Sequence, residues 1–265
     1  MSADPKARWR VRLAFLSLFV FLVVLSIGAW YLTDLGRLQD RRAARESQAS
    51  LQGVTEPAQI DAALRQHPSD RFLQTLAMAM RAADNTSAAA LKLSNEVEQP
   101  PIPAGINLAA ASHGDIEALA RNLKTAEANA TAFMPRYTAL LKAERDSVER
   151  SALSLHVDSE TLGKLLDVID RRQAEMTAFT AKMMAARAGF YRAYQSLVAV
   201  IAGEAGSYKV VDGQFIFQFS RTVDRYNAAA AATAAAASRV GELEQEGKRL
   251  ATSQQAAWVA FANGK

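Results

Sequence analysis

The sequence predicts an all-α protein, in which a single transmembrane helix near the N-terminus precedes an elongated antiparallel helical bundle with one short β-hairpin. Three observations predict this fold class. An uncharged apolar run fills residues 13–32, apolar heptads fill much of the second half of the chain, and one strand-like stretch near 208–217 separates two helical patterns. The 265-residue chain is 50% hydrophobic, which is ample for a core.

The apolar run, LAFLSLFVFLVVLSIGAWYL, has the length of a membrane-spanning helix. Twenty residues span about 30 Å as a helix, which is the thickness of the hydrocarbon core of a bilayer. Trp30 and Tyr31 at its far end suit the interface between lipid and water. We therefore predict a basic flank at 1–12 and a transmembrane anchor at 13–33, which contacts membrane lipid through Leu13 to Leu32.

A cleavable signal peptide is an alternative interpretation of this run, and a buried helix of a soluble domain is another. Ser26-Ile27-Gly28 has the small residues of a signal-peptidase site. The apolar region of a signal peptide is, however, about 7 to 15 residues long, and this run continues through Tyr31. We favour an uncleaved signal anchor for this reason.

The predicted topology depends on two weaker arguments, because basic residues flank the run equally on both sides. The N-terminal flank resembles that of a Sec signal anchor, and long domains translocate largely regardless of charge. We therefore expect a single-pass protein of the bacterial inner membrane with most of its chain in the periplasm. The basic residues are Lys6, Arg8, Arg10 and Arg12 before the run, and Arg37, Arg41, Arg42 and Arg45 after it.

Charge and cysteine content exclude several kinds of site. The formal net charge of +4 is modest for this length and does not indicate a nucleic-acid partner. The chain has no cysteine, which excludes disulfides, thiol nucleophiles and an N-terminal lipidated cysteine.

Residues 34–99 are predicted to form short helices, and a Pro-rich linker at 100–105 separates them from the remainder of the chain. Serine and threonine favour helix N-caps, because their side-chain oxygens accept hydrogen bonds from free backbone amides. The expected helices begin after Thr55 with Pro57 in the first turn, run from Asp70 to Ala83 behind Ser69, and begin again near Ser87.

Residues 106–265 are predicted to form a long three-helix bundle. The first helix is expected from Asp115 to about Leu155 with a kink at Pro135, the second behind Asp158 or Ser159, and the third from Arg221 to Ala262. Nine alanines and Thr233 fill residues 228–237, and we expect this part to be a tightly packed waist because small side chains allow close helix approach.

The second of these helices carries a regular heptad, and such a seam buries itself against another helix as in a coiled coil. The last helix repeats the pattern from Val240 to Phe261. The seam of the second helix is Leu162, Ile169, Met176, Met183, Phe190 and Leu197, with the companion positions Leu165, Arg172, Phe179, Ala186, Ala193 and Val200.

The strand-like stretch at 208–217 predicts a β-hairpin. Asp212-Gly213 lies between β-branched and aromatic residues, which is a strong signal for a type I′ turn with positive φ at both central positions. An isolated hairpin is marginally stable in water, so Phe215, Phe217 and Phe219 are expected to pack on the end of the bundle or on a partner.

The region around the hairpin contains the runs Gly206-Ser207-Tyr208, Val211-Asp212-Gly213-Gln214-Phe215 and Asp224-Arg225-Tyr226-Asn227. Over these roughly 25 residues, the chain resembles a family of helical periplasmic lipoproteins of unknown function from enteric bacteria. The resemblance implies a location in the cell envelope and a mostly α fold. The present chain differs from this family in having an apolar anchor in place of the lipidated cysteine.

The sequence predicts neither an enzyme nor a cofactor or metal site. His67, His113 and His156 lack the spacing of metal ligands, and the chain contains no nucleophile-elbow, phosphate-loop or dinucleotide motif. Acidic residues are matched by basic residues four positions away, which is typical of exposed helix faces. These pairs are Lys142 with Asp146, Arg145 with Glu149, Asp146 with Arg150 and Asp167 with Arg171.

Two functions therefore remain open. The first is a non-enzymatic envelope protein with a structural or protein-interaction role, in which the apolar hairpin contacts a protein partner and the heptads also permit a homo-oligomer. The alternative is a small-molecule-binding sensory or carrier bundle, suggested by Arg187 and aromatic residues at helical spacing on the second long helix. The candidate contacts to a ligand or partner are Arg187, Tyr191, Tyr194, Phe215, Phe217 and Phe219.

Overall fold

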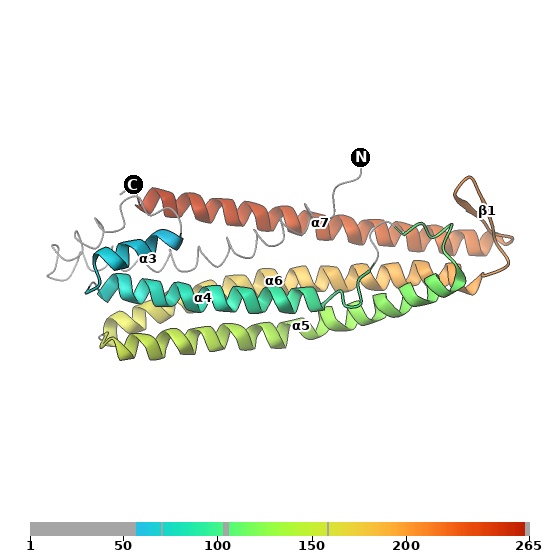
Figure 1. The fold of residues 1–265 in the computed structure, drawn as a ribbon. Coiled ribbons are helices and arrows are strands. Elements are labelled where there is room, and N and C mark those ends of the chain that lie inside the picture. Colours follow the sequence, from blue (N-terminus) through green and yellow to red (C-terminus); the bar gives the residue numbers. More distant parts are fainter. Residues whose placement is uncertain (1–56, 70, 103–105, 158, 263–265) are drawn as a thin grey trace. The chain divides into compact units, whose positions relative to one another are not determined.

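A computed structural model describes residues 57–69, 71–102, 106–157 and 159–262, and these residues are mostly helical with one short hairpin (Figure 1). The predicted all-α class with a hairpin is thereby confirmed. The predicted anchor lies outside the described residues. Among the described helices, none has both the length and the apolar character that crossing a bilayer requires. The elements are α3 Pro57–Gln66, α4 Arg71–Glu96, α5 His113–Ser154, α6 Ser159–Gly203, β1 Lys209–Val211, β2 Gln214–Ile216 and α7 Ser220–Ala262.

The chain folds into two compact units, and the long helices α4 to α7 each contribute to both. Among the described residues, unit 1 holds those up to 91 together with 137–178 and 247–262. Unit 2 holds 92–136 and 179–246. Both units include residues from either side of the Pro-rich linker.

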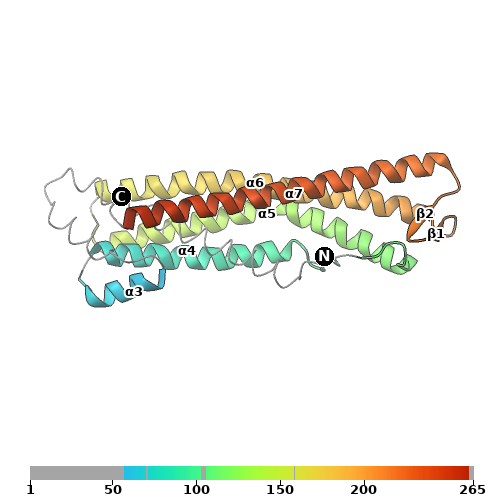
Figure 2. The same cartoon turned by 90° about the horizontal axis from the view of Figure 1, so that it is seen from above.

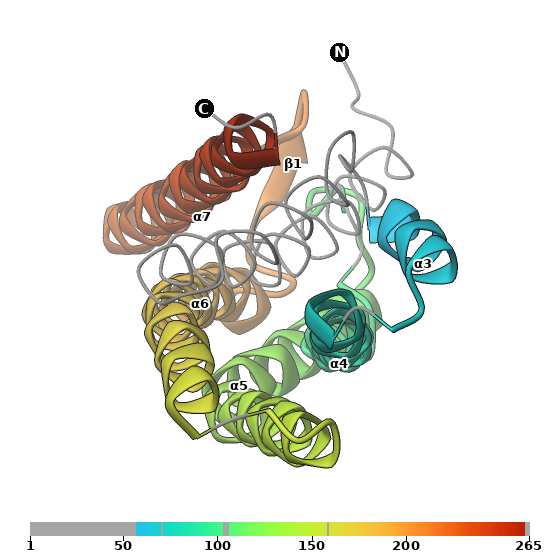
Figure 3. The same cartoon turned by 90° about the vertical axis from the view of Figure 1, so that its left-hand side faces the viewer.

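In unit 1, side chains of α4 and α6 both contact α5, and the three helices lie side by side (Figure 3). The amide of Gln173 on α6 donates to the backbone oxygen of Leu141 on α5 at 2.9 Å. Helix α3 is fastened to α4 by an ion pair between Asp61 and Arg81 at 3.1 Å. The core of this unit is apolar and includes Ile60, Ala77, Ala83, Val148, Leu162 and Ile169.

Helix α4 corrects the sequence-based division of this region into separate short helices. The expected break between Ala83 and Ser87 is absent, and α4 continues as one helix to Glu96. Asp, Thr and Ser favour breaks and caps only where no better partner is present. Here the Thr86 hydroxyl donates to Glu144 on α5, and Ser87 is buried. Tertiary contacts thus satisfy the polar side chains that would otherwise stop the helix.

The ends of α5 show two capping arrangements. At its start, the Ser112 amide donates to Asp115 Oδ2 at 3.0 Å, and the Asp115 amide donates to Ser112 Oγ at 3.2 Å, which makes a capping box. At its end, the Val157 amide donates to Ala152 and the His156 amide to Leu153, with His156 at φ 57°. These two bonds define a Schellman motif with His156 at the position that glycine usually occupies.

We expect His156→Gly to stabilise unit 1 by about 0.5–1 kcal/mol, because glycine adopts positive φ without a Cβ clash. The measurement is the free energy of unfolding from denaturant titration followed by circular dichroism. His156→Ala removes the same imidazole but keeps a Cβ, so it should give no gain. A gain for alanine equal to that for glycine would contradict the backbone explanation.

The buried face of α6 follows the predicted heptad only in part. The seam residues Leu162, Ile169 and Leu197 are buried as expected. Between them, Met183 and Phe190 are only half-buried, and the neighbouring residues Met184 and Tyr191 are buried instead.

The expected tightly packed waist in α7 is wrong. None of residues 228–237 is buried, and six of them are exposed. In unit 2, α7 buries Thr222 and Leu243 and leaves the alanines outside the core. The alanines therefore stabilise α7 through their high helix propensity, and not through close packing against another helix.

The hairpin has the predicted turn. Strands β1 and β2 pair antiparallel with Val211 opposite Gln214 and Val210 opposite Phe215. Asp212 and Gly213 have φ values of 51° and 76°, as a type I′ turn requires. The hairpin joins the end of α6 to the start of α7 (Figure 2).

Candidate functional site

One face of the hairpin belongs to an aromatic cluster formed by Tyr208, Phe215, Phe217 and Tyr226. The ring centroids of Tyr208 and Phe215 are 5.0 Å apart, and Phe217 stacks on Phe215 at 5.9 Å. Tyr226 of α7 contacts both phenylalanines, at 5.6 and 5.3 Å. Aromatic pairs at these distances stabilise beyond their buried area. Two of the predicted contact residues, Phe215 and Phe217, thus anchor the hairpin to α7.

The opposite face of the hairpin is exposed and partly apolar. Val211 and Ile216 point away from the aromatic cluster by strand alternation and are 52% and 50% exposed. Phe219, which was expected to pack, is 64% exposed. Of the seven large apolar residues exposed among the described residues, five lie within 210–223. Val210 lies opposite Phe215 and therefore on the face of the aromatic cluster. We call the other four residues, Val211, Ile216, Phe219 and Val223, the hairpin patch.

Glu204 fixes the base of the hairpin. Its Oε1 accepts a hydrogen bond from the Thr222 hydroxyl at 3.0 Å, and its Oε2 accepts one from the Ser207 hydroxyl at 3.0 Å. Because Ser207 precedes β1 and Thr222 follows β2, one carboxylate ties both ends of the hairpin to the end of α6. The sequence pattern contained no signal for this role.

The other predicted candidates, Arg187 and Tyr191, meet a residue that sequence reasoning missed. Glu98, just after α4, accepts a 2.7 Å bond from Arg187 Nη2 and another 2.7 Å bond from the Tyr191 hydroxyl. Arg187 Nε also donates to the Tyr191 oxygen at 3.2 Å. Glu98 is separated from its two partners by 89 and 93 residues, so only the tertiary fold brings them together.

Burial and neighbouring charges determine the protonation states of Arg187, Tyr191 and Glu98, which together form the Arg187 cluster. Burial raises the pKa of Tyr191. The Arg187 charge acts in the opposite direction and the Glu98 charge adds to the increase, so the phenol is protonated and donates. Burial lowers the pKa of Arg187, but Tyr191 and Glu98 outweigh this effect and the net shift is upward. Burial also raises the pKa of Tyr194, whose ring lies 5.9 Å from that of Phe190. The cluster is therefore a charged pair with a neutral phenol.

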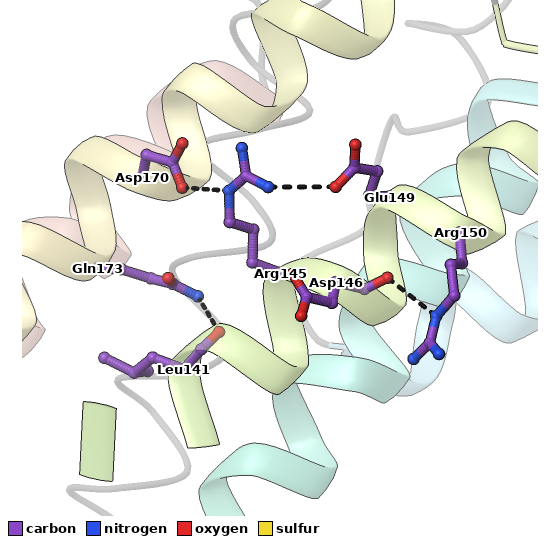
Figure 4. Close-up of polar contacts among 7 residues, drawn as sticks. All are labelled: Leu141, Arg145, Asp146, Glu149, Arg150, Asp170 and Gln173. Carbon is purple, nitrogen blue, oxygen red and sulfur yellow. Dashed lines mark hydrogen bonds and ion pairs between the residues drawn. The ribbon is translucent and has the colours of Figure 1, made fainter. Parts of the chain in front are cut away.

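Polar contacts between α5 and α6 in unit 1 are structural in character (Figure 4). Arg145 on α5 reaches Asp170 on α6 at 2.7 Å and also forms the predicted pair with Glu149 at 3.1 Å. Arg150 donates to the backbone oxygen of Asp146. Arg171 likewise donates to a backbone oxygen, that of Asp167. Such partly exposed contacts contribute little to stability individually.

Glu144 on α5 is the most perturbed carboxyl group of unit 1. Its residue is only 9% exposed. Burial raises the pKa of Glu144 to about 7, although the hydrogen bond from Thr86 acts in the opposite direction. Burial also raises the pKa of Asp84 on α4, and the Asp61 charge adds to that shift.

Histidines and acidic residues do not assemble into a metal site in the part of the chain that the structure describes. His113 lies 3.3 Å from Glu117 on an exposed surface of α5. His156 has the backbone capping role described above, and His67 is exposed after α3.

Comparison of the chain with protein-family models, with curated proteins and with solved structures finds no match in any of the three. The resemblance of residues 206–227 to periplasmic lipoproteins thus stays a prediction.

Proposed function

We propose that this chain is a non-enzymatic envelope protein that binds another protein through the hairpin patch. In this proposal the segment 13–33 anchors an elongated antiparallel bundle in the bacterial inner membrane, and most of the chain lies in the periplasm. The single observation that carries the binding role is the grouping of exposed apolar side chains on the hairpin and the adjoining start of α7. Large exposed apolar residues that gather in one segment are more typical of interaction sites than residues scattered singly over a surface.

Two further features support a protein partner. The hairpin is held in one conformation by the aromatic cluster and by Glu204, so its outer face is preorganised, which lowers the entropic cost of binding. Asp212 lies at the turn between the strands, and a carboxylate at that position disfavours insertion into lipid. The patch therefore suits a protein surface better than a bilayer.

The test is photocrosslinking in intact cells with a photoreactive residue at Phe219. We expect a discrete crosslinked product with one protein. The same residue at Leu153, which is exposed at the end of α5, should give none. Equal labelling at both positions would contradict a specific interface.

Ile216→Asp should reduce the Phe219 crosslink about tenfold, because it places a charge in an apolar interface. Ile216 is half exposed in the free protein, so its replacement should leave the helical circular dichroism unchanged. Leu153→Asp is the matched control and should not affect the crosslink. A crosslink that persists in Ile216→Asp would refute the role of the hairpin patch.

A further inference from the structure

Two donors on α6 hold the Glu98 carboxylate in the way that a binding site holds a carboxylate ligand. One carboxylate oxygen of Glu98 accepts bonds from two donors, Arg187 Nη2 and the Tyr191 hydroxyl, both at 2.7 Å. Arginine combined with a neutral hydroxyl is a common recognition set for carboxylates, because both bonds are charge-assisted. We propose that Arg187 and Tyr191 form a carboxylate-binding site that the chain's own Glu98 occupies, and from which a small organic carboxylate can displace it.

The two donors are also held by contacts that do not involve Glu98. Arg187 and Tyr191 are four residues apart and therefore lie on the same face of α6. Arg187 Nε donates to the Tyr191 oxygen at 3.2 Å, and the Tyr191 ring makes an edge contact with Phe190 at 5.7 Å. Tyr191 is 1% exposed and the Arg187 side chain 13% exposed. The site is thus built on a rigid element and is nearly dehydrated.

Glu98, which accepts both hydrogen bonds, is more exposed to solvent than Arg187 or Tyr191. The Glu98 side chain is 31% exposed and follows the last turn of α4, outside any helix. The backbone beside it is fastened independently, because Asn129 donates to the Glu96 oxygen at 3.0 Å and Val97 is buried. The movement that the proposal requires is a rotation of the Glu98 side chain, and these contacts keep the backbone at the end of α4 in place during it.

This inference is independent of the proposed hairpin interface, since it involves other residues and another ligand class. Its test is chemical rescue of Glu98→Ala in the full chain by sodium acetate, compared with sodium chloride at equal ionic strength. If acetate binds with a dissociation constant of about 10 mM, 100 mM acetate lowers the unfolding equilibrium constant about tenfold. We expect this shift in Glu98→Ala and less than about a twofold shift in the wild type, where Glu98 competes.

Two controls make the test specific. Glu127→Ala removes the partner of Arg192, which lies 2.8 Å away on the exposed surface of the same unit, and should show no acetate effect. Adding Arg187→Met to Glu98→Ala should abolish the rescue. Equal effects of acetate and chloride on Glu98→Ala, or a rescue that survives Arg187→Met, would overturn the proposal.

Loss of folding in Glu98→Ala would not end the test. In that case, acetate is titrated into the unfolded variant and the helical signal is followed by circular dichroism. We expect acetate to restore the helical signal, and its failure to do so would also refute the site. Phosphate in place of acetate reports on the ligand class. An effect of phosphate equal to that of acetate would contradict a carboxylate site and indicate a general anion site.

Discussion

Glu144→Gln is expected to stabilise unit 1 by about 3 kcal/mol at pH 8 and to have little effect near pH 4. The pKa of Glu144 is about 7 in the folded protein, against 4.5 for an ordinary glutamate. Between these values the folded state holds a proton that the unfolded state has released. Stability therefore falls as pH rises from about 4.5 through about 7, and the loss is complete above the folded pKa.

Glutamine removes this cost because it does not ionise, while its side-chain oxygen still accepts the hydrogen bond from Thr86. The measurement is the free energy of unfolding between pH 4 and 8 from denaturant titrations. The wild-type stability should decline across this range relative to Glu144→Gln. Asp167→Asn on the exposed surface of α6 in unit 1 is the matched control and should follow the wild type. Parallel wild-type and Glu144→Gln curves would show that Glu144 ionises normally.

Glu98→Ala is expected to cost unit 2 about 3 kcal/mol, because it leaves the guanidinium of Arg187 buried without its carboxylate. Arg187→Met should cost less, about 1 kcal/mol, since the remaining Glu98 is partly exposed and can turn toward water. The unequal costs follow from unequal exposure of the two partners. Denaturant titration in chloride buffer measures both values.

The double variant completes a thermodynamic cycle. Glu98→Ala with Arg187→Met should be more stable than Glu98→Ala alone, because no buried charge remains. Glu127→Ala breaks a pair with the exposed Arg192 and a hydrogen bond from Gln195, and it should cost about 1 kcal/mol because both partners can turn toward water. A double variant whose cost equals the sum of the single costs would mean that Glu98 and Arg187 do not interact energetically.

Local sequence patterns were sufficient for the elements whose stability is local. The Asp212-Gly213 turn was predictable because few residues adopt positive φ at two successive positions. The long helices α5, α6 and α7 were predictable from apolar periodicity and helix propensity, with ends within a few residues of those expected.

The errors occur where long-range contacts decide the outcome. The break near Ala83 was expected from capping residues, but contacts of Thr86 and Ser87 keep α4 continuous. The alanines of α7 were expected to be packed, but their composition fixes only that they form a helix and not which face is buried.

The sequence by itself determined a mostly helical protein with one type I′ hairpin, because hydrophobic period, helix propensity and turn chemistry act over a few residues. The tertiary structure alone decided which polar groups meet. It brought Glu98 to Arg187 and Tyr191, buried Glu144 beside Thr86, and placed Phe215 and Phe217 in a cluster while Phe219 remained exposed. Such contacts join residues distant in sequence, and their energies depend on burial, which no local pattern specifies.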